Sequence, residues 1–556
     1  MSTIATTSSR AGGMTRDEKF VIFASSLGTT FEWYDFYLYA TLAPFFAALF
    51  FPPGNDTAAL LSAFATYAAG FLVRPFGAII FGRIGDLVGR KYTFLVTIVV
   101  MGSATFLVGL LPTFATVGWL APILLVTLRL CQGLALGGEY GGAATYVAEH
   151  SRPHERGYTT SWIQTTATLG FFLALLVIGL CRVYMDAKVF AEWGWRIPFL
   201  VSLILLVFSV YIRLRLSETP VFLKMREEGK GSKAPLTESF LRYPNNKYVL
   251  LALLGATAGQ GVVWYTGQFY ALFFLLLILK LDFISTYALI AVSLVIGTPF
   301  FILFGWLSDR IGRLKIILAG CAIAAATYTT VLFPGLTHFV NPDLEKFQQG
   351  NQLTVTVDPA TCQLNAPWNI PTPCDAARDV MTKAGLSFTT TNGPAGSLPT
   401  LIIKSAAASK TIDSTSVANW QITNGPVWLK ALGDAGYPAK ADLAKVNWFM
   451  TELILVIMVI YVTMVYGPIA AFLVEMFPTK IRYTSMSLPY HIGNGWFGGM
   501  LPLLATAVVS ATGNIYAGLW YPIGVAVMTL VIGLLFLRDT KGVDISTGSG
   551  VSIQKG

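Results

Sequence analysis

Two acidic residues in the first apolar stretch have the spacing and surroundings of a proton-binding site. Glu32 and Asp35 are three residues apart among apolar and aromatic residues, and on a helix they share an arc of about 80° with Tyr39. A carboxyl group buried in a low-dielectric setting binds a proton more readily than one in water. Glu139, in a later apolar stretch, is a third candidate proton carrier. The alternative for Asp35 is a structural salt bridge, with Arg74 as its partner.

A second polar stripe combines a cation, an amide and an acid. Arg129, Gln132 and Glu139 also fall within an arc of about 80° on a helix. A guanidinium group stays protonated and binds a carboxylate through two parallel hydrogen bonds. With Arg74, the stripe favours an anionic substrate, unless Arg129 simply pairs with Glu139. The neighbouring run GLALGGEYGG is typical of close helix–helix packing.

A third set lies in the second part of the chain, where Gln260, Trp264 and Gln268 follow the i, i+4, i+8 spacing of one helix face. Amides can hydrogen-bond carboxylates or hydroxyls, and an indole can cover an apolar or cationic group. Hydrogen bonding between helices is the alternative. The predicted substrate-binding residues are Tyr39, Arg74, Arg129, Gln132, Gln260, Trp264 and Gln268.

Nothing in the sequence points to covalent or metal chemistry. His150 and His154 are four residues apart, but Pro153 between them disrupts a helical metal pair. No GxxxxGK[ST] run is present that could cradle a nucleotide phosphate. We therefore expect no enzyme activity, no metal, no cofactor and no nucleotide, and we expect H+ as the coupling ion.

The composition predicts the elements that must position these residues. Of 556 residues, 54% are hydrophobic and 12% are charged, which excludes a soluble enzyme, a disordered chain and a disulfide scaffold. A spanning helix needs roughly 20 mostly apolar residues. Twelve stretches meet this requirement, so the fold class is an all-α membrane protein. The predicted spans are 20–51, 58–81, 92–112, 119–147, 158–181, 195–216, 248–280, 284–307, 316–336, 447–474, 484–510 and 515–537.

The basic residues predict the orientation of these spans. With the N-terminus in the cytoplasm, the cytoplasmic segments collect 24 of the 38 Lys and Arg residues. The net charge of +9 is therefore a topology signal, and we expect no nucleic-acid binding. Both termini are predicted to be cytoplasmic, in a multi-pass protein of the cell inner membrane without a cleavable signal peptide.

Two loops repeat one pattern. Residues 82–91 read GRIGDLVGRK and residues 305–315 read GWLSDRIGRLK. Glu–Arg pairs also recur around the loops after the fourth and tenth spans. The chain therefore consists of two six-helix halves, as in transporters that bind substrate between parallel repeats. The predicted gating residues are Gly82, Asp86, Gly89 and Arg90, their counterparts Gly305, Asp309, Gly312 and Arg313, and the flanking Glu149, Arg156, Glu475 and Arg482.

The repeated loops have a physical interpretation as a latch on the cytoplasmic side. Asp86 can accept hydrogen bonds at a helix N-terminus, and Arg90 can pair with an acid across the half. The alternative is that these basic residues only keep the loops inside. Such a latch is a gate and not a substrate site.

One polar segment, 337–446, separates the ninth and tenth spans and is predicted to lie outside. It contains eight basic and eight acidic residues, and its Cys362 and Cys374 could form a disulfide or remain free thiols. The predicted organisation is a tail at 1–19, the first half at 20–216, a cytoplasmic loop at 217–247, the second half at 248–537 and a tail at 538–556.

The loop GRIGDLVGRK resembles the signature loop of the major facilitator superfamily. The blocks FEWYDFYLYA, RLCQGLALGGEYGG, WGWRIPF and EMFPTKIRYTS together resemble the metabolite:proton symporter family. The resemblance covers nearly the whole chain except the insert, which departs from the family pattern. It implies a major facilitator fold and transport of small organic acids such as shikimate, oxoglutarate and citrate, or of osmolytes such as proline and betaine.

We therefore expect a monomeric secondary transporter in the lipid bilayer that moves a small organic anion together with a proton by alternating access. An osmolyte symporter for betaine or proline is the alternative within the same class. A receptor or interaction protein that uses the outside insert is the alternative in a different class, and such a protein would show no counterflow.

Overall fold

The computed structural model describes residues 16–51, 65–216, 218–363, 372–406, 408–415, 420–545 and 550. Within these ranges, eleven helical segments are long and apolar enough to cross a membrane. The 35-residue helix α1 (Arg16–Phe50), whose apolar run is interrupted by Glu32 and Asp35, is the twelfth. The prediction of twelve spanning helices is confirmed.

The N-terminal half consists of six long helices, with short helices in its connections. The long helices are α1, Ala65–Leu87 with α3 (Arg74–Leu87) as its second part, α4 (Arg90–Leu110), α6 (Leu120–His150), α7 (Arg156–Tyr184) and Gly194–Leu214, which joins η1 (Gly194–Arg196) to α9 (Ile197–Leu214). The short helices are α5 (Phe114–Val117) and α8 (Ala187–Glu192).

The C-terminal half repeats this arrangement with helices that contain π-helical turns. Its long segments are Asn245–Ile278, Phe283–Ile311, Arg313–Val340, Trp448–Met476, Thr479–Thr512 and Ala517–Phe536. Their α-helical parts are α12 (Asn245–Ala252), α13 (Ala258–Tyr265), α14 (Ala271–Phe273), α15 (Phe283–Gly297), α16 (Pro299–Ile311), α17 (Arg313–Thr327), α18 (Phe333–Val340), α23 (Trp448–Tyr466), α24 (Ile469–Met476), α25 (Arg482–His491), α26 (Leu501–Thr512) and α27 (Trp520–Phe536). The π-helical turns are η2 (Leu253–Thr257), η3 (Thr266–Tyr270), η4 (Phe274–Ile278), η5 (Tyr328–Leu332) and η8 (Ile492–Gly498), and the 3-10 turns are η7 (Thr479–Ile481) and η9 (Ala517–Leu519).

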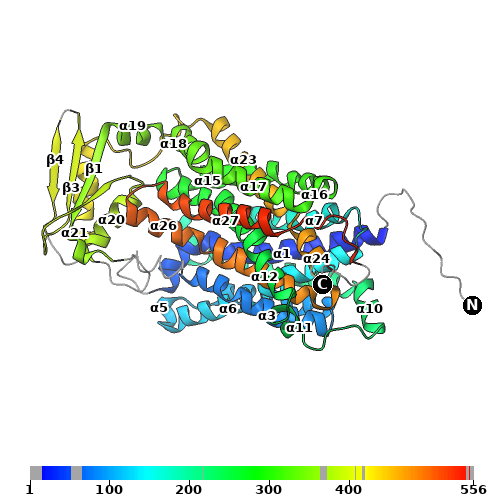
Figure 1. Ribbon diagram of the computed structural model, residues 1–556. Helices are drawn as coiled ribbons and strands as arrows, with labels where there is room; N and C mark the ends of the chain where they lie inside the picture. The colour runs from blue at the N-terminus through cyan, green and yellow to red at the C-terminus, as the bar shows by residue number, and fades with distance from the viewer. Residues whose placement is uncertain are drawn as a thin grey trace, which may run out of the picture.

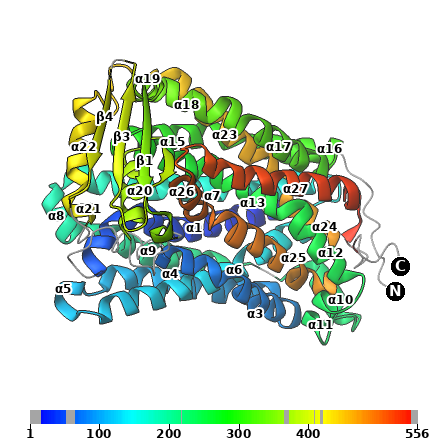
Figure 2. The ribbon, with the colours of Figure 1, turned by 60° about the vertical axis from the view of Figure 1, so that its left-hand side comes forward.

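The two halves lie against each other with their long helices roughly aligned. In Figure 2 the blue helices α3, α4, α5 and α6 of the N-terminal half lie below most of the green to red helices of the C-terminal half, and α1 and α7 lie in the middle of the molecule. The two halves are connected through α10 (Pro220–Glu227) and α11 (Pro235–Phe240). These short helices lie at the end of the bundle opposite the β-sheet (Figure 1).

Several helices begin at arginines that the sequence placed in loops. Arg90, Arg156, Arg313 and Arg482 are the first residues of α4, α7, α17 and α25. Apolar length alone places the start of each of these helices too late in the chain, because backbone hydrogen bonding does not require apolar side chains. The arginines are buried at the bundle end, where acidic partners neutralise them.

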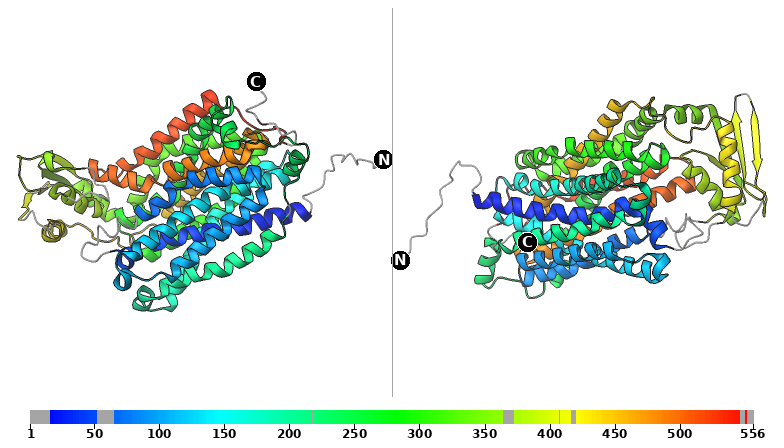
Figure 3. Two further views of the ribbon diagram at one scale, coloured as in Figure 1. Left: turned by 90° about the horizontal axis from the view of Figure 1, so that it is seen from below. Right: turned by 180° about the vertical axis from the view of Figure 1, so that it is seen from behind.

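The insert adds a β-sheet that the all-α prediction did not include. Its strands β1 (Asn351–Val357), β2 (Thr389–Asn392), β3 (Thr400–Ser405) and β4 (Ser409–Asp413) are ordered β2-β1-β3-β4. β1 pairs parallel with β2 and antiparallel with β3, and β3 pairs antiparallel with β4. Alternation along β1 buries Leu353, Val355 and Val357 on one face. Figure 3 shows the sheet projecting beyond one end of the helices.

Short helices and a disulfide complete the insert. The helices are α19 (Pro342–Gly350), η6 (Pro359–Thr361), α20 (Pro373–Lys383), α21 (Trp420–Thr423) and α22 (Gly425–Asp434). Cys362 and Cys374 are joined in a disulfide, with their Cα atoms 5.2 Å apart. The insert is attached to the C-terminal half, since Phe388 N donates to Gly513 O at 2.7 Å and Asn341 Nδ2 donates to Leu279 O at 2.9 Å.

Candidate functional site

The repeated loops lie at one end of the bundle, which we call the signature-loop end. There, each loop aspartate accepts hydrogen bonds from the backbone of the other half. Asp86 Oδ2 accepts from Thr484 N at 2.9 Å, and Oδ1 accepts from Tyr483 N at 3.3 Å. Both donors lie in the first turn of α25, where backbone N–H groups have no partner within the helix. A buried carboxylate is stabilised there by these hydrogen bonds and by the helix dipole.

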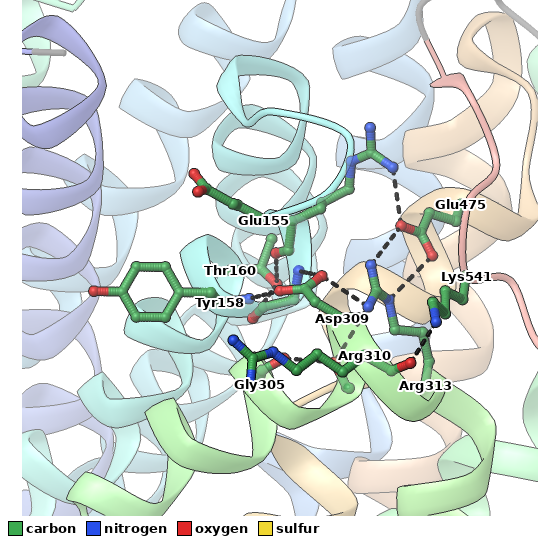
Figure 4. A network of polar contacts seen from close by, with 12 residues as sticks. Glu155, Tyr158, Thr160, Gly305, Asp309, Arg310, Arg313, Glu475 and Lys541 are labelled. Carbon is green, nitrogen blue, oxygen red and sulfur yellow. Dashed lines mark hydrogen bonds and ion pairs between the residues drawn. The ribbon is translucent and has the colours of Figure 1, made fainter. Parts of the chain in front are cut away.

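The second loop makes the equivalent contact in the opposite direction, from the C-terminal half to the N-terminal half. Asp309 in α16 accepts from Gly157 N at 2.9 Å and from Tyr158 N at 2.8 Å, in the first turn of α7 (Figure 4). Arg313 lies 2.8 Å from the Asp309 carboxylate. Each half therefore contributes one carboxylate to a helix N-terminus of the other half.

Two glutamates join the arginines of both halves. We call these glutamates and arginines, together with the two loop aspartates, the latch: Asp86, Arg90, Glu149, Arg156, Asp309, Arg313, Glu475 and Arg482. Glu149 lies 2.8 Å from Arg482, and Glu475 lies 2.9 Å from Arg156, so both pairs cross between halves. Arg90 contacts Glu149 at 3.6 Å within its own half, and its Nη2 reaches Thr479 O of the other half at 2.9 Å. Seven of the eight latch residues are buried and Asp309 is partly exposed, and together they join the two halves at the signature-loop end.

The loop glycines are required by backbone geometry. Gly89 and Gly312 have φ angles of +143° and +117°, which side-chain-bearing residues rarely adopt. Gly82 and Gly305 permit close approach instead. A Cβ at Gly305 would lie 2.3 Å from Ser161 Cβ, and a Cβ at Gly82 would lie 3.0 Å from Thr484 Cα. The pattern of the repeated loop thus serves contact between the halves.

Two of the three predicted proton carriers, Glu32 and Glu139, lie beside a cation that sequence reasoning counted as a loop residue. Arg213, in α9, lies 2.7 Å from Glu32 and 3.7 Å from Glu139. Asp35 accepts from Ser202 Oγ at 2.5 Å. All of these side chains are buried. We call Glu32, Asp35, Glu139 and Arg213 the acid cluster.

Two arginines of the N-terminal half lack a carboxylate partner among the described residues. The Arg74 and Arg129 guanidinium carbons lie 4.4 and 4.6 Å from the centre of the Phe36 ring, so the two cations share one aromatic ring. The alternative pairs that the sequence left open, Arg74 with Asp35 and Arg129 with Glu139, are not among the ion pairs of the described residues. Nε and Nη2 of both arginines are buried without a hydrogen-bond partner within the described part of the chain. Unneutralised buried cations are costly unless a ligand supplies the charge.

Gln132 and Tyr39 lie beside Arg129, whereas Gln260 hydrogen-bonds across helices. Gln132 Oε1 accepts from Arg129 at 2.8 Å, and the Tyr39 ring centre is 4.7 Å from the Arg129 guanidinium carbon. Gln260 instead exchanges two hydrogen bonds with Asn494, at 3.0 and 2.8 Å. That exchange is the helix-to-helix contact that the sequence left open as an alternative.

Trp264 and Gln268 keep free polar atoms in the described structure. The Trp264 indole nitrogen and both amide atoms of Gln268 are buried without a hydrogen-bond partner there. Trp264 packs across the halves against Trp33 and Tyr37, with ring centres 6.0 and 6.3 Å apart. Gln268 lies in the π-helical turn η3, so its position departs from the regular i+4 spacing.

Arg213 and Tyr483 are functional candidates that the sequence reasoning missed. Arg213 sits in the motif RLRL at the end of an apolar stretch, where a basic residue is ordinarily read as a loop marker. Tyr483 belongs to the block EMFPTKIRYTS, in which only Glu475 and Arg482 were predicted to be gating residues. No pattern in one sequence pairs these residues with α1 or α6, since the contacts are made across helices.

The fold and the site define the class of this protein, a multi-pass membrane transporter built from two similar halves. A family model described as the Major Facilitator Superfamily matches residues 25–343, and the match ends a few residues into the insert. The chain belongs to the major facilitator superfamily. It is a transporter of metabolites and not an enzyme.

Relatives and solved structures agree with this assignment. The chain is 38% identical over 309 residues to the inner membrane metabolite transport protein YhjE of Escherichia coli, covering 53% of this chain and 68% of that protein. It is 35% identical over 305 residues to the E. coli shikimate transporter, covering 54% and 68%. The proline/betaine transporter of Salmonella typhimurium is 36% identical over 310 residues, covering 54% and 61%.

Among solved structures, the proton:xylose symporter XylE bound to 6-bromo-6-deoxy-D-glucose superimposes with a TM-score of 0.62 at 14% identity. The superposition covers 95% of this chain and 98% of that one. This likeness shows the fold.

Proposed function

We propose that this protein carries a small organic anion together with a proton. The observation that carries the proposal is the pair of buried guanidinium groups, Arg74 and Arg129, without a carboxylate partner in the described structure. A mono-, di- or tricarboxylate would supply the missing charge through bidentate hydrogen bonds. The similarity to the shikimate transporter and to the alpha-ketoglutarate permease of E. coli supports this substrate class.

The binding site lies between the halves. A Cβ at Gly495, in η8 of the C-terminal half, would lie 3.7 Å from Arg74 Cδ. Trp264 and Gln268 of the C-terminal half contribute the free indole and amide groups described above. A substrate held by both halves is released when the halves separate at one end, which is the basis of alternating access.

The acid cluster is the proposed proton site. Ionisable groups inside a membrane are costly and are usually functional. Arg213 neutralises one negative charge, while the cluster holds three carboxyl groups, Glu32, Asp35 and Glu139. Binding a proton would reduce the excess negative charge, so this cluster can load and release H+.

We place the signature-loop end in the cytoplasm of a cell with an inner membrane, because the basic residues concentrate there. The insert and its disulfide would then face the oxidising outer side. The closed latch corresponds to a state that is shut on the cytoplasmic side. We propose that the monomer is the transporting unit.

Symport of a zwitterionic osmolyte is the second candidate. Trp33, Tyr37, Trp264 and Phe269 form a continuous aromatic group near the centre of the bundle, with Tyr37 and Phe269 rings 5.6 Å apart. Aromatic faces bind quaternary ammonium groups. The likeness to the proline/betaine transporter points the same way.

Uptake into proteoliposomes separates these candidates. A panel of organic acids, betaine and proline is offered with and without an inward proton gradient. The proposal expects an organic acid to accumulate, faster when the outside is acid. Accumulation of betaine alone would favour the second candidate, and uptake of every substrate at a rate independent of the proton gradient would refute proton coupling.

A further inference from the structure

A tyrosine of the C-terminal half inserts into the N-terminal half directly beside the latch. Tyr483 in α25 is fully buried, and its hydroxyl donates to the carbonyl oxygen of Gly138 in α6. Its own backbone N–H donates to Asp86 at 3.3 Å. One residue therefore connects the latch to α6 through both its backbone and its side chain.

The surface that receives the ring is made of glycines. A Cβ at Gly85 would lie 2.0 Å from Tyr483 Cδ1, and one at Gly141 would lie 2.8 Å from Cε2. A Cβ at Gly142 would lie 2.6 Å from the hydroxyl oxygen and 3.2 Å from Cζ. We call Gly85, Gly138, Gly141 and Gly142 the tyrosine slot. Side chains at these positions would occupy the space of the ring.

The tyrosine slot and the acid cluster share one turn of α6. Glu139 follows Gly138, the acceptor of the tyrosine hydroxyl, and lies 3.7 Å from Arg213. The charged groups near the ring come from several elements: Asp86, Arg90, Glu32 and Arg213 interact electrostatically with the phenol, and Glu139 follows the slot residue Gly138 in α6. A change at Glu139 would therefore act on the residue next to the acceptor of the tyrosine hydroxyl.

The geometry points to Tyr483 as a positioning residue that holds the signature-loop end closed and transmits changes at Glu139 to the latch. This inference rests on the proposed alternating-access function, because closure of this end matters only if the halves rock. The phenol makes no contact with the two unpartnered arginines in the described structure. Its role is therefore to respond to the position of the α6 turn at Gly138 and not to bind substrate.

The first test adds a methyl group to the tyrosine slot and then removes the hydroxyl group that this methyl group would contact. Spin labels at Val88→Cys and Ile311→Cys, which are exposed positions of the two halves at the signature-loop end, report its width in a Cys131→Ser background. Gly142→Ala is expected to lengthen the distance between the labels. Adding Tyr483→Phe removes the clashing oxygen and should restore the short distance.

The control for added bulk is Gly179→Ala, since a Cβ at Gly179 meets nothing within 4 Å. Tyr483→Ala adds no bulk but empties the slot, so it should also lengthen the distance if Gly142→Ala fails to fold. An unchanged short distance in both Gly142→Ala and Tyr483→Ala would overturn the inference. Lengthening in Gly142→Ala that Tyr483→Phe does not reverse would also overturn it.

The second test measures coupling to the acid cluster. Glu139→Gln is expected to change the closed fraction several-fold when Tyr483 is present and much less in the Tyr483→Ala background, as a double-mutant cycle. Equal effects in both backgrounds would overturn the coupling. These distances are measured without substrate or gradient, so failed anion uptake would contradict only the proposed function.

Discussion

At the scale of single residues, the pairing of the buried charges separates two roles that look alike in the sequence. Arg74, Arg129 and Arg213 all lie within the helical bundle, but Arg213 alone lies within salt-bridge distance of carboxylates in the described structure. An arginine with acidic partners has its charge neutralised within the protein, whereas an arginine without them is costly to bury until an anion binds. On the basis of this difference we propose substrate binding for Arg74 and Arg129 and proton handling for the acid cluster around Arg213.

Arg129→Lys should weaken substrate binding although the charge is kept, because lysine cannot form two parallel hydrogen bonds with a carboxylate. A hydrogen bond to a charged group is worth about 1.5–3 kcal/mol, so KM for the organic anion should rise about ten- to hundredfold. Uptake kinetics in proteoliposomes measure this change. Arg196→Lys is the matched control, since Arg196 donates to the backbone oxygens of Gly109 and Leu111. An unchanged KM in Arg129→Lys would refute the carboxylate contact.

Asp35→Asn and Glu32→Gln should differ because their partners differ. Ser202, the hydroxyl partner of Asp35, can also hydrogen-bond an amide, so Asp35→Asn should abolish gradient-driven accumulation and keep counterflow. Glu32→Gln weakens the charge compensation of Arg213 and should lower stability by up to about 3–5 kcal/mol, seen as a lower Tm. Equal loss of driven uptake and counterflow in Asp35→Asn would show a structural role instead.

At the scale of elements, helix N-termini hold the two halves together. The first turns of α7 and α25 each receive a carboxylate from the other half. These contacts consist of few hydrogen bonds and are sensitive to charge, so they can form and break repeatedly. The latch is therefore suited to a switch more than to permanent association.

Asp86→Asn should open the signature-loop end. The variant keeps one oxygen acceptor but loses the charge that favours a helix N-terminus, which is worth about 0.3–1 kcal/mol or more when buried. The closed fraction should fall roughly two- to tenfold, as measured with the label pair at Val88 and Ile311. Asp309→Asn should act in the same direction because its contacts are equivalent. A change in neither variant would mean that the ion pairs of Glu149 and Glu475 are sufficient for closure.

At the scale of the whole molecule, the insert belongs to the C-terminal half. Its contacts to Leu279 and Gly513 fix it to loops at the end opposite the latch (Figure 1). We expect the insert to move with that half as one body.

Cys374→Ser should destabilise the insert and leave transport intact. Loss of the disulfide removes a constraint on the unfolded segment, worth about 3 kcal/mol for a loop of this size. Limited proteolysis of the full chain should cut the insert faster, while organic-anion uptake stays within about twofold. Cys131→Ser, which removes a free cysteine, is the control. Loss of uptake together with normal protease resistance would assign the insert a direct part in transport.

The sequence alone predicted the features that depend on local composition and on the repeat. Apolar length predicted the twelve spans, and the recurrence of glycine, aspartate and arginine, together with the repeated Glu–Arg pairs, predicted the two halves and the latch residues. The locations of Asp86 and Arg90 follow from the loop pattern. The family resemblance likewise follows from short, contiguous blocks.

Only the tertiary structure decided which charges face each other. The partners of Glu32 and Asp35 come from α9, and the partner of the glycine-rich run is Tyr483 from the other half. A helical stripe shows which residues share a face, but it does not show which helix packs against that face. The sheet in the insert was also missed, because its strands are short and polar on one side. Charge pairing depends on distances across helices, and those distances exist only once the two halves are packed.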